Sequence, residues 1–217
     1  MDLTPPQAVI FDWDNTLVDT WPLIMKCMNN TLEHFGLEAW PLEDIKIKIH
    51  KSLREWFPEL FGDRWEEARD IYYDSYLVKY ADHQLVPLPG AIETLELCKN
   101  NNLPMMIVSN KRSPTLRHEL DKLGLGHYFI SVVGAADAVK DKPDPAPVLL
   151  AMKPCGIALG QHVWFIGDTI SDIECAHNTN SLPILYGDNK IDKAQLNHIQ
   201  VANHQELMSL FNSQLNQ

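Results

Sequence analysis

The chain has 217 residues, of which 45% are hydrophobic and 22% are charged, and its formal net charge is -11. This length suffices for one core with a small appended domain, and the negative charge excludes a general nucleic-acid binder, whose surface would be basic. No apolar run approaches the roughly 20 residues that a membrane-spanning helix needs. The first residues have no basic region followed by an apolar stretch, so we expect no secretory signal and predict a cytoplasmic protein.

The cysteines are widely separated in the sequence and form no CxxC pair, which argues against a zinc or redox motif. They are Cys27, Cys98, Cys155 and Cys175. We therefore expect thiols in a reducing compartment, for the most part buried.

Five short apolar runs are typical of strands that are buried on both faces. They are residues 8–11, 104–108, 131–133, 162–166 and 182–186. Helical patterns lie between them: Leu116, Leu120 and Leu123 share one face of a helix that Ser113 is expected to cap. This alternation predicts an α/β domain with a doubly wound parallel sheet, a Rossmann-like core.

Polar side chains directly follow three of the predicted strands: Asp12 follows the first, Ser109 and Asn110 the second, and Asp168 the fourth. In an open parallel sheet, ligands bind at the carboxyl ends of the strands. We therefore expect these residues to converge on one site.

The segment 18–86 lacks clear strand and turn signals and is predicted to be an inserted α-helical domain. The stretch 45–49 alternates as a strand would, but Leu42, Ile45 and Ile49 also share a helical face, so we predict a helix there. Residues 1–17 and 87–217 then form the core domain. An insertion after the first strand is expected to serve as a cap over the carboxyl end of that strand.

Asp12 and Asp14, two residues apart after a strand, can both serve one site. The Asp12 carboxylate can attack phosphorus to give an aspartyl-phosphate. Asp14 can protonate the leaving oxygen and then activate a water molecule. A polar turn explains such a pair at least as well, so the wider pattern decides.

Four motifs occur in order along the chain: FDWDNTLVD at 11–19, IVSN at 107–110, KPDP at 142–145 and FIGDTISD at 165–172. Together they resemble the motifs of the haloacid-dehalogenase-like hydrolase superfamily. The sequence is most similar to the phosphoglycolate phosphatase-like branch, which has a small helical cap. The resemblance spans nearly the whole chain.

The resemblance implies a Mg²⁺ site built from aspartates. Asp12 and Asp168 would hold the ion with the backbone carbonyl of Asp14, and oxygen ligands of this kind suit Mg²⁺. Asp172 would act from behind these ligands or through a water. Asp172 is equally interpreted as an acid favoured in the first turn of a helix.

The resemblance also implies a phosphate-binding site. Ser109 would donate its hydroxyl to a phosphoryl oxygen, and backbone N–H groups near Asn110 would add to it. Lys142 would neutralise charge on Asp12 and on the transition state. His50 and Lys51 in the cap are candidates for contact with the leaving group. The alternative for that loop is that Ser52 and Glu55 only cap a short helix.

We therefore predict a Mg²⁺-dependent phosphatase that acts on small phosphorylated metabolites resembling phosphoglycolate, as a monomer or homodimer without nucleic-acid or membrane partners. Asp14 favours phosphoryl transfer over dehalogenation, because halide leaves without a proton. Two alternatives remain: a phosphomutase of the same superfamily and a non-catalytic binding module on the same fold. A carbon–phosphorus hydrolase would need a cap lysine, and Lys46, Lys48 and Lys51 are present.

Overall fold

A computed structural model describes residues 3–49, 52–80, 82–192, 194 and 196–215. The chain divides into two compact units, Met1–Val18 with Pro87–Gln217 and the inserted Asp19–Val86. The larger unit contains a six-stranded sheet in the order β5-β4-β1-β6-β7-β8, and all of its strands are parallel. The strands are β1 (Ala8–Phe11), β4 (Met105–Arg112), β5 (Ser131–Ala135), β6 (Val163–Gly167), β7 (Leu182–Tyr186) and β8 (Ile199–Val201).

The strand order reverses at β1, because the chain first builds outward through β4 and β5 and then returns to place β6 on the other side of β1. Phe11, the last residue of β1, is in register with Ile107 of β4 and Ile166 of β6. Asp12 and Asp168 therefore leave the sheet side by side after β1 and β6, whereas β4 continues beyond this register through Ser109 to Arg112. A crevice at such a reversal is where doubly wound sheets bind ligands.

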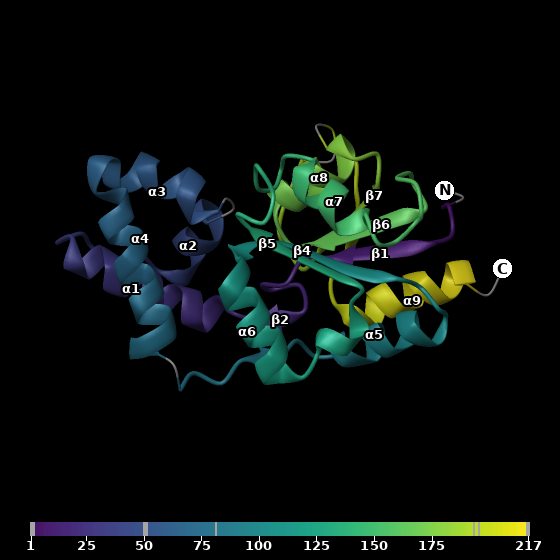
Figure 1. Cartoon of the computed structure of the whole chain (residues 1–217), viewed down its shortest axis with the longest axis horizontal. Coiled ribbons are helices and arrows are strands. Elements are labelled where there is room, and N and C mark those ends of the chain that lie inside the picture. The colour runs from purple at the N-terminus through teal and green to yellow at the C-terminus, as the bar shows by residue number, and fades with distance from the viewer. Residues whose placement is uncertain (1–2, 50–51, 81, 193, 195, 216–217) are drawn as a thin grey trace. The chain divides into compact units, whose positions relative to one another are not determined.

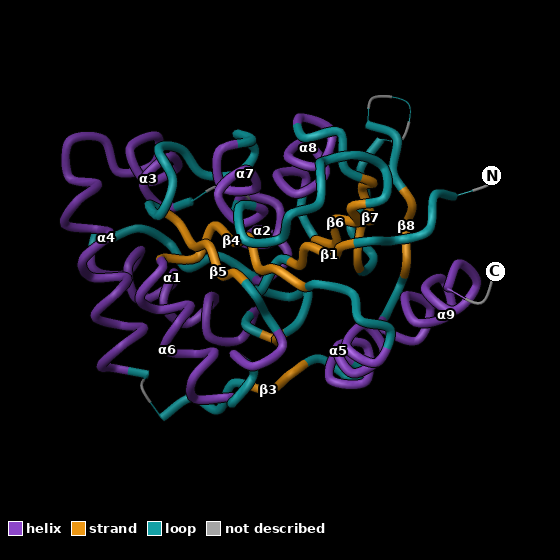
Figure 2. The backbone as a smooth tube through the Cα atoms, turned by 45° about the vertical axis from the view of Figure 1, so that its right-hand side comes forward, coloured by secondary structure: helices purple, strands orange, loops and turns teal. Residues whose placement is uncertain are grey.

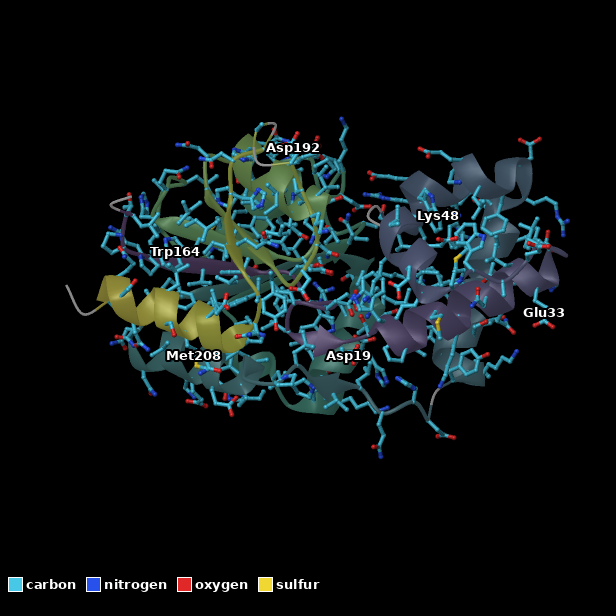
Figure 3. The ribbon with its side chains drawn as sticks, turned by 180° about the vertical axis from the view of Figure 1, so that it is seen from behind. Asp19, Glu33, Lys48, Trp164, Asp192 and Met208 are labelled. Carbon is cyan, nitrogen blue, oxygen red and sulfur yellow. The ribbon has the colours of Figure 1, made fainter. Side chains whose placement is uncertain are left out.

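Helices cover both faces of this sheet, as Figure 1 shows for α7 and α8 on one face and α5, α6 and α9 on the other. Their bounds are α5 (Ala91–Asn100), α6 (Ser113–Leu123), η3 (Gly126–Tyr128), α7 (Ala146–Met152), α8 (Ile170–Asn178) and α9 (His204–Leu215). Alternate strand residues such as Ile10 and Phe165 are fully buried in the core that includes α7 and α8. On the opposite face Trp164 stacks on Phe211 of α9, with ring centroids 4.9 Å apart (Figure 3).

The inserted unit is helical, as predicted, and Figure 2 shows its helices in purple. Its elements are α1 (Trp21–His34), α2 (Leu42–Lys48), α3 (Leu53–Phe61), η1 (Gly62–Arg64), α4 (Trp65–Asp74) and the π-helix η2 (Ser75–Lys79). An apolar face of α1 that includes Met28 packs with Phe57 and Tyr72 in a separate core rich in aromatic rings. The ambiguous stretch is helical in α2, where Ile45 is buried while Ile47 is exposed. Two short strands at the connections, β2 (Val18–Asp19) and β3 (Val86–Pro87), pair with each other.

The fold class is confirmed, whereas some local predictions were wrong. Ser113 is the first residue of α6 and does not cap it, because the N-cap position falls on Arg112 and no side chain bonds there. Ser52 precedes α3 in extended conformation, but its hydroxyl has no hydrogen-bond partner and the expected capping box does not form. The four cysteines are free thiols, and all but Cys155 are buried. Among the described residues, no helix is both long and apolar enough to cross a membrane.

Candidate active site

Asp12 and Asp168 lie next to each other because they end neighbouring parallel strands. The backbone N–H of Asp12 donates to the carbonyl of Ile166 at 2.9 Å, which extends the β1–β6 ladder to the catalytic candidate itself. Asp168 follows Gly167, the last residue of β6. Both carboxylates are buried, Asp12 at 6% exposure and Asp168 at 4%. The sequence therefore brings two carboxyl groups together in largely buried surroundings.

Asp172 reaches the same place from the first turn of α8. Its Oδ2 accepts hydrogen bonds from the backbone N–H and the hydroxyl of Thr169, at 2.9 and 2.7 Å, in a capping box that starts the helix. Gly167 makes room for it, since a methyl group there would lie 2.2 Å from Asp172 Cγ. Asp172 thus lies in the first turn of its helix, as one interpretation of the sequence predicted, and it also faces the other acids. Its predicted role toward a metal ion stays a prediction.

Lys142 supplies the positive charge at the centre of the acids. Its ammonium lies 2.9 Å from Asp12 Oδ1 and 2.6 Å from Asp172 Oδ1, and the residue is 2% exposed. Asn110 holds its backbone through two reciprocal bonds of 3.0 Å: Asn110 Nδ2 donates to the Lys142 carbonyl, and the Lys142 N–H donates to Asn110 Oδ1. The Asn110 side chain therefore fixes the lysine, which leaves its predicted phosphate contact to the backbone.

The charges in this cluster are unbalanced toward the negative. Burial raises the pKa of Asp12 to about 6, and the Lys142 ammonium opposes that rise. The carboxylates of Asp172 and Asp14 add to it. Burial also raises the pKa of Asp168 well above its ordinary value, and the charges of Asp12 and Asp172 raise it further. Burial disfavours the charged form of Lys142, yet the attraction of Asp12 and Asp172 outweighs it and raises the pKa of the ammonium.

This arrangement fits a divalent cation. One carboxylate oxygen from each of Asp12, Asp168 and Asp172 lies within 4.8 Å of the others, and all three residues are buried. Hard oxygen ligands suit Mg²⁺, and its charge would offset the excess that raises the two pKa values. Both carboxylate oxygens of Asp172 are already bonded, Oδ1 by Lys142 and Oδ2 by Thr169, whereas Lys142 engages only Oδ1 of Asp12. Asp12 and Asp168 are therefore the better placed pair of ligands.

Ser109 lies on β4 beside the strand that carries Asp12, and it is 4% exposed. Its Oγ accepts a hydrogen bond of 3.2 Å from the backbone N–H of Lys111. The hydroxyl proton is thereby directed away from that amide. The predicted phosphate-binding role of Ser109 stays a prediction, as do the roles of the aspartates and of Lys142.

Asp14 lies at the start of a turn that continues through Asn15, whose φ of 56° is left-handed. Glycine adopts this conformation most readily, and among residues that have a side chain Asn tolerates it best. The Asp14 side chain is 21% exposed, and its Oδ1 lies 2.5 Å from the ammonium of Lys111. The predicted metal contact of Asp14 concerns its carbonyl, so the ion pair leaves that prediction untouched.

Three residues near the site escaped the sequence reasoning. Lys111 joins Asp14 to Glu119 of α6, and Asn189 donates a side-chain hydrogen bond to the carbonyl of Asp168. A signal for Glu119 existed: it stands between Leu116 and Leu120 on the apolar face of its helix, where a carboxylate needs a partner. The two candidate cap contacts, His50 and Lys51, lie outside the described residues.

Comparisons with known proteins agree with the motifs. The chain matches the haloacid dehalogenase-like hydrolase family over residues 9–184. Phosphoglycolate phosphatase 1 of Pseudomonas aeruginosa is 30% identical over 179 residues, which cover 79% of this chain but only 65% of that protein. Pyrophosphatase PpaX of Listeria welshimeri is 31% identical over 176 residues, covering 81% of this chain and 80% of that protein.

A solved structure shows the same fold over almost the whole length. The crystal structure of a HAD-superfamily hydrolase from Ehrlichia chaffeensis matches with a TM-score of 0.72 and 34% identity, and the match covers 99% of this chain and 100% of that one. The family match alone spans far more than half of the sequence. The chain therefore belongs to the haloacid dehalogenase-like hydrolase family.

Proposed function

We propose that this protein is a Mg²⁺-dependent phosphatase that hydrolyses small phosphomonoesters through a phosphorylated Asp12. The observation that carries the proposal is the buried pair of Lys142 and Asp12, 2.9 Å apart, beside Asp168 and Asp172 at the reversal of strand order. The phosphatases among the relatives support the reaction class.

In the first step, an Asp12 carboxylate oxygen attacks phosphorus and the bond from phosphorus to the leaving oxygen breaks. Asp14 gives its proton to that leaving oxygen, so the alcohol departs neutral. Lys142 stabilises the charge that develops on the phosphoryl group, and Ser109 donates its hydroxyl to a phosphoryl oxygen. Asp12, Asp168 and the carbonyl of Asp14 would hold Mg²⁺, which would supply positive charge that reduces the repulsion between carboxylate and phosphate.

In the second step, Asp14 has become a carboxylate and removes a proton from water. The water oxygen attacks phosphorus, the bond to Asp12 breaks, and inorganic phosphate leaves. Asp14 is again protonated and Asp12 again ionised, so one cycle consumes one phosphoester and one water. The Lys142 ion pair favours the ionised form of Asp12 that the first step needs.

We further propose that residues 18–86 form a cap that selects the substrate, with His50 and Lys51 as candidate contacts. The point of insertion supports this role, because the unit begins directly after the turn that holds Asp14. Lys51→Met should raise KM for a preferred substrate with little change in kcat. Unchanged kinetics would remove Lys51 from the proposal.

The first experiment measures phosphate release from a panel that includes phosphoglycolate, sugar phosphates, nucleoside monophosphates and pyrophosphate. Pyrophosphate is included because one relative is a pyrophosphatase. We expect release that requires Mg²⁺ and disappears in Asp12→Asn, while Asp121→Asn, an exposed acid on α6, leaves it unchanged.

Other outcomes would contradict the proposal in distinct ways. Phosphate release that persists in Asp12→Asn would exclude Asp12 as the nucleophile. Transfer between positions of a sugar without net phosphate release would indicate a phosphomutase. Ligand binding without any turnover across the panel would indicate a binding module.

A further inference from the structure

A chain of buried charges behind Asp14 takes no part in the proposed reaction. Lys111 Nζ lies 2.5 Å from Asp14 Oδ1 and 3.0 Å from Glu119 Oε2. The same Glu119 oxygen accepts a hydrogen bond of 2.7 Å from the indole N–H of Trp13. Trp13 precedes Asp14 in the chain, so the four residues close a ring around the start of the first turn.

The burial of this ring is costly and calls for a reason. The side chains of Lys111 and Glu119 are 7% and 2% exposed, and Trp13 is fully buried. Placing an ammonium and a carboxylate in such surroundings requires desolvation that an ion pair offsets only with good geometry. An apolar pair on α6 and β4 would fill the same space without that cost. The cost therefore indicates that the ring has a function that requires these side chains in fixed positions.

Asp14 is the partly exposed member of the ring. Lys111 bonds only Oδ1, and Oδ2 makes no hydrogen bond to the described residues. A general acid must present one defined oxygen to the leaving group. Held through Oδ1, the Asp14 carboxyl group has a fixed plane and keeps its second oxygen for the proton.

Glu119 gives this hold its rigidity. A lysine side chain has four rotatable carbon bonds, so an ion pair with Asp14 alone would allow many positions. Glu119 on α6 and Trp13 in the bend after β1 are both buried, and their hydrogen bond fixes the carboxylate that binds the ammonium from behind. The position of the Asp14 carboxyl group is thereby set by α6 and not by the turn that contains Asp14.

We propose that Lys111 and Glu119 are positioning residues that orient Asp14 for proton transfer to the leaving oxygen. The inference deepens the proposed function and rests on it, since it assumes that Asp14 is the general acid. Neither residue needs to touch the substrate. The distinguishing consequence of this inference is that losing either residue lowers kcat/KM only for substrates whose leaving group requires a proton.

The test compares kcat/KM for two substrates in each variant. One is p-nitrophenyl phosphate, whose leaving group departs readily as an anion, and the other is the best alkyl phosphate of the panel. For this mechanism kcat/KM reports the steps up to phosphoryl transfer to Asp12, so the shared second step does not enter. The ratio of the two values is independent of the fraction of correctly folded enzyme.

We expect Lys111→Met to lower kcat/KM for the alkyl phosphate by roughly 10²-fold or more, the usual worth of general acid catalysis, with only a small change for p-nitrophenyl phosphate. Glu119→Gln should shift the ratio in the same direction by less, because Lys111 remains. The matched control is Lys140→Met, an exposed lysine paired with Asp144 at 3.5 Å, which should change neither value.

Asp14→Asn separates the two ideas. One outcome is that Asp14→Asn lowers kcat/KM selectively for the alkyl phosphate while Lys111→Met and Glu119→Gln do not. In that case the positioning inference is wrong and the proposed function stands. If Asp14→Asn lowers kcat/KM equally for both substrates, the acid role of Asp14 itself is wrong. In the expected case, adding Lys111→Met to Asp14→Asn produces no further selective loss, because the group to be positioned is already gone.

Discussion

At the scale of single residues, the described part of the site is characterised by an excess of carboxylates over positive charges. Within the part of the chain that the structure describes, Lys142 is the one cation that contacts both Asp12 and Asp172, at 2.9 and 2.6 Å. Burial and neighbouring carboxylates raise the pKa of Asp12 to about 6 and that of Asp168 well above its ordinary value. Burial and an excess of negative charge cause both shifts, and the charge of a bound Mg²⁺ would oppose them.

This charge imbalance predicts a stabilising effect of Mg²⁺ that can be measured without any substrate. At 100 times its Kd, Mg²⁺ should stabilise the folded chain by about 2.7 kcal/mol, or roughly 5–10 °C in Tm. Thermal melting in MgCl₂ and in chelator measures the shift. Asp168→Asn should lose most of it, because one of the two best placed ligands becomes neutral, whereas the exposed Asp121→Asn should keep it. Equal shifts in all three proteins would place Mg²⁺ elsewhere.

At the scale of elements, the start of α8 is as important as the strands. Asp172 is held by the capping box with Thr169 and passes directly over Gly167 at the end of β6. The helix start and the strand end therefore share one tight space. A side chain at position 167 would have to displace the carboxylate that binds Lys142.

We predict that Gly167→Ala lowers kcat/KM by about 10²-fold, a loss typical of a misplaced catalytic group, and destabilises the chain by roughly 1–3 kcal/mol through overpacking. The physical reason is the 2.2 Å approach of the added carbon to Asp172 Cγ. Gly126→Ala is the control, since an added carbon there meets nothing within 4 Å. Kinetics together with thermal melting measure both effects, and wild-type activity in Gly167→Ala would show that Asp172 can move without consequence.

The helix α6 illustrates what a sequence pattern leaves open. Its apolar stripe at Leu116, Leu120 and Leu123 was sufficient to predict a helix on the sheet. The stripe could not identify the partners of Glu119, because Trp13 is 106 positions away in the chain. Contacts of this kind come from the packing of α6 near β1 and have no local signature.

At the scale of the whole molecule, His204 joins distant parts of the larger unit. It is fully buried at the start of α9, and its Nε2 donates to the carbonyl of Thr16, 2.9 Å away in the first turn. Its Nδ1 lies 2.9 Å from the hydroxyl of Thr94 on α5. Burial lowers the pKa of His204 from 6.5 to about 4.

This lowered pKa predicts how His204 affects stability as pH changes. Between about pH 4 and 6.5 the unfolded chain binds a proton at His204 that the folded chain does not, so this contribution is fully present above pH 6.5 and is lost as pH falls toward 4. The loss amounts to about 3 kcal/mol. Buried Asp12 and Asp168, with raised pKa values, act in the opposite direction, so the test needs a comparison of variants.

The measurement is the free energy of unfolding in urea from pH 4.5 to 7 for the wild type and His204→Gln. The difference between the two proteins should shrink steadily toward low pH. The exposed His127→Gln should follow the wild-type curve. A difference that stays constant with pH would show that His204 contributes only through packing and hydrogen bonds.

Much of the larger unit was predictable because strands that are buried in a parallel sheet consist of runs of apolar residues. All five predicted strands are present, and Asp12 and Asp168 directly follow two of them as expected. The prediction that Ser109 and Asn110 follow their strand was wrong, because β4 continues through both residues to Arg112. The three residues of β8 were missed, since Ile199–Val201 is too short to show a pattern. The two hydrogen bonds between Asn110 and Lys142 could not be predicted either, because they join β4 to a turn 32 positions further along the chain.

The most direct test of the account is to look for phosphate bound to Asp12. Asp14→Asn should still accept a phosphoryl group from p-nitrophenyl phosphate in Mg²⁺ but should lack the base for the second step. After acid quenching, peptide mass spectrometry should find one phosphoryl group per chain on the peptide that contains Asp12, and none in Asp12→Asn. Phosphate on another residue, or turnover by Asp14→Asn with no phosphorylated chain at any time, would contradict Asp12 as the nucleophile.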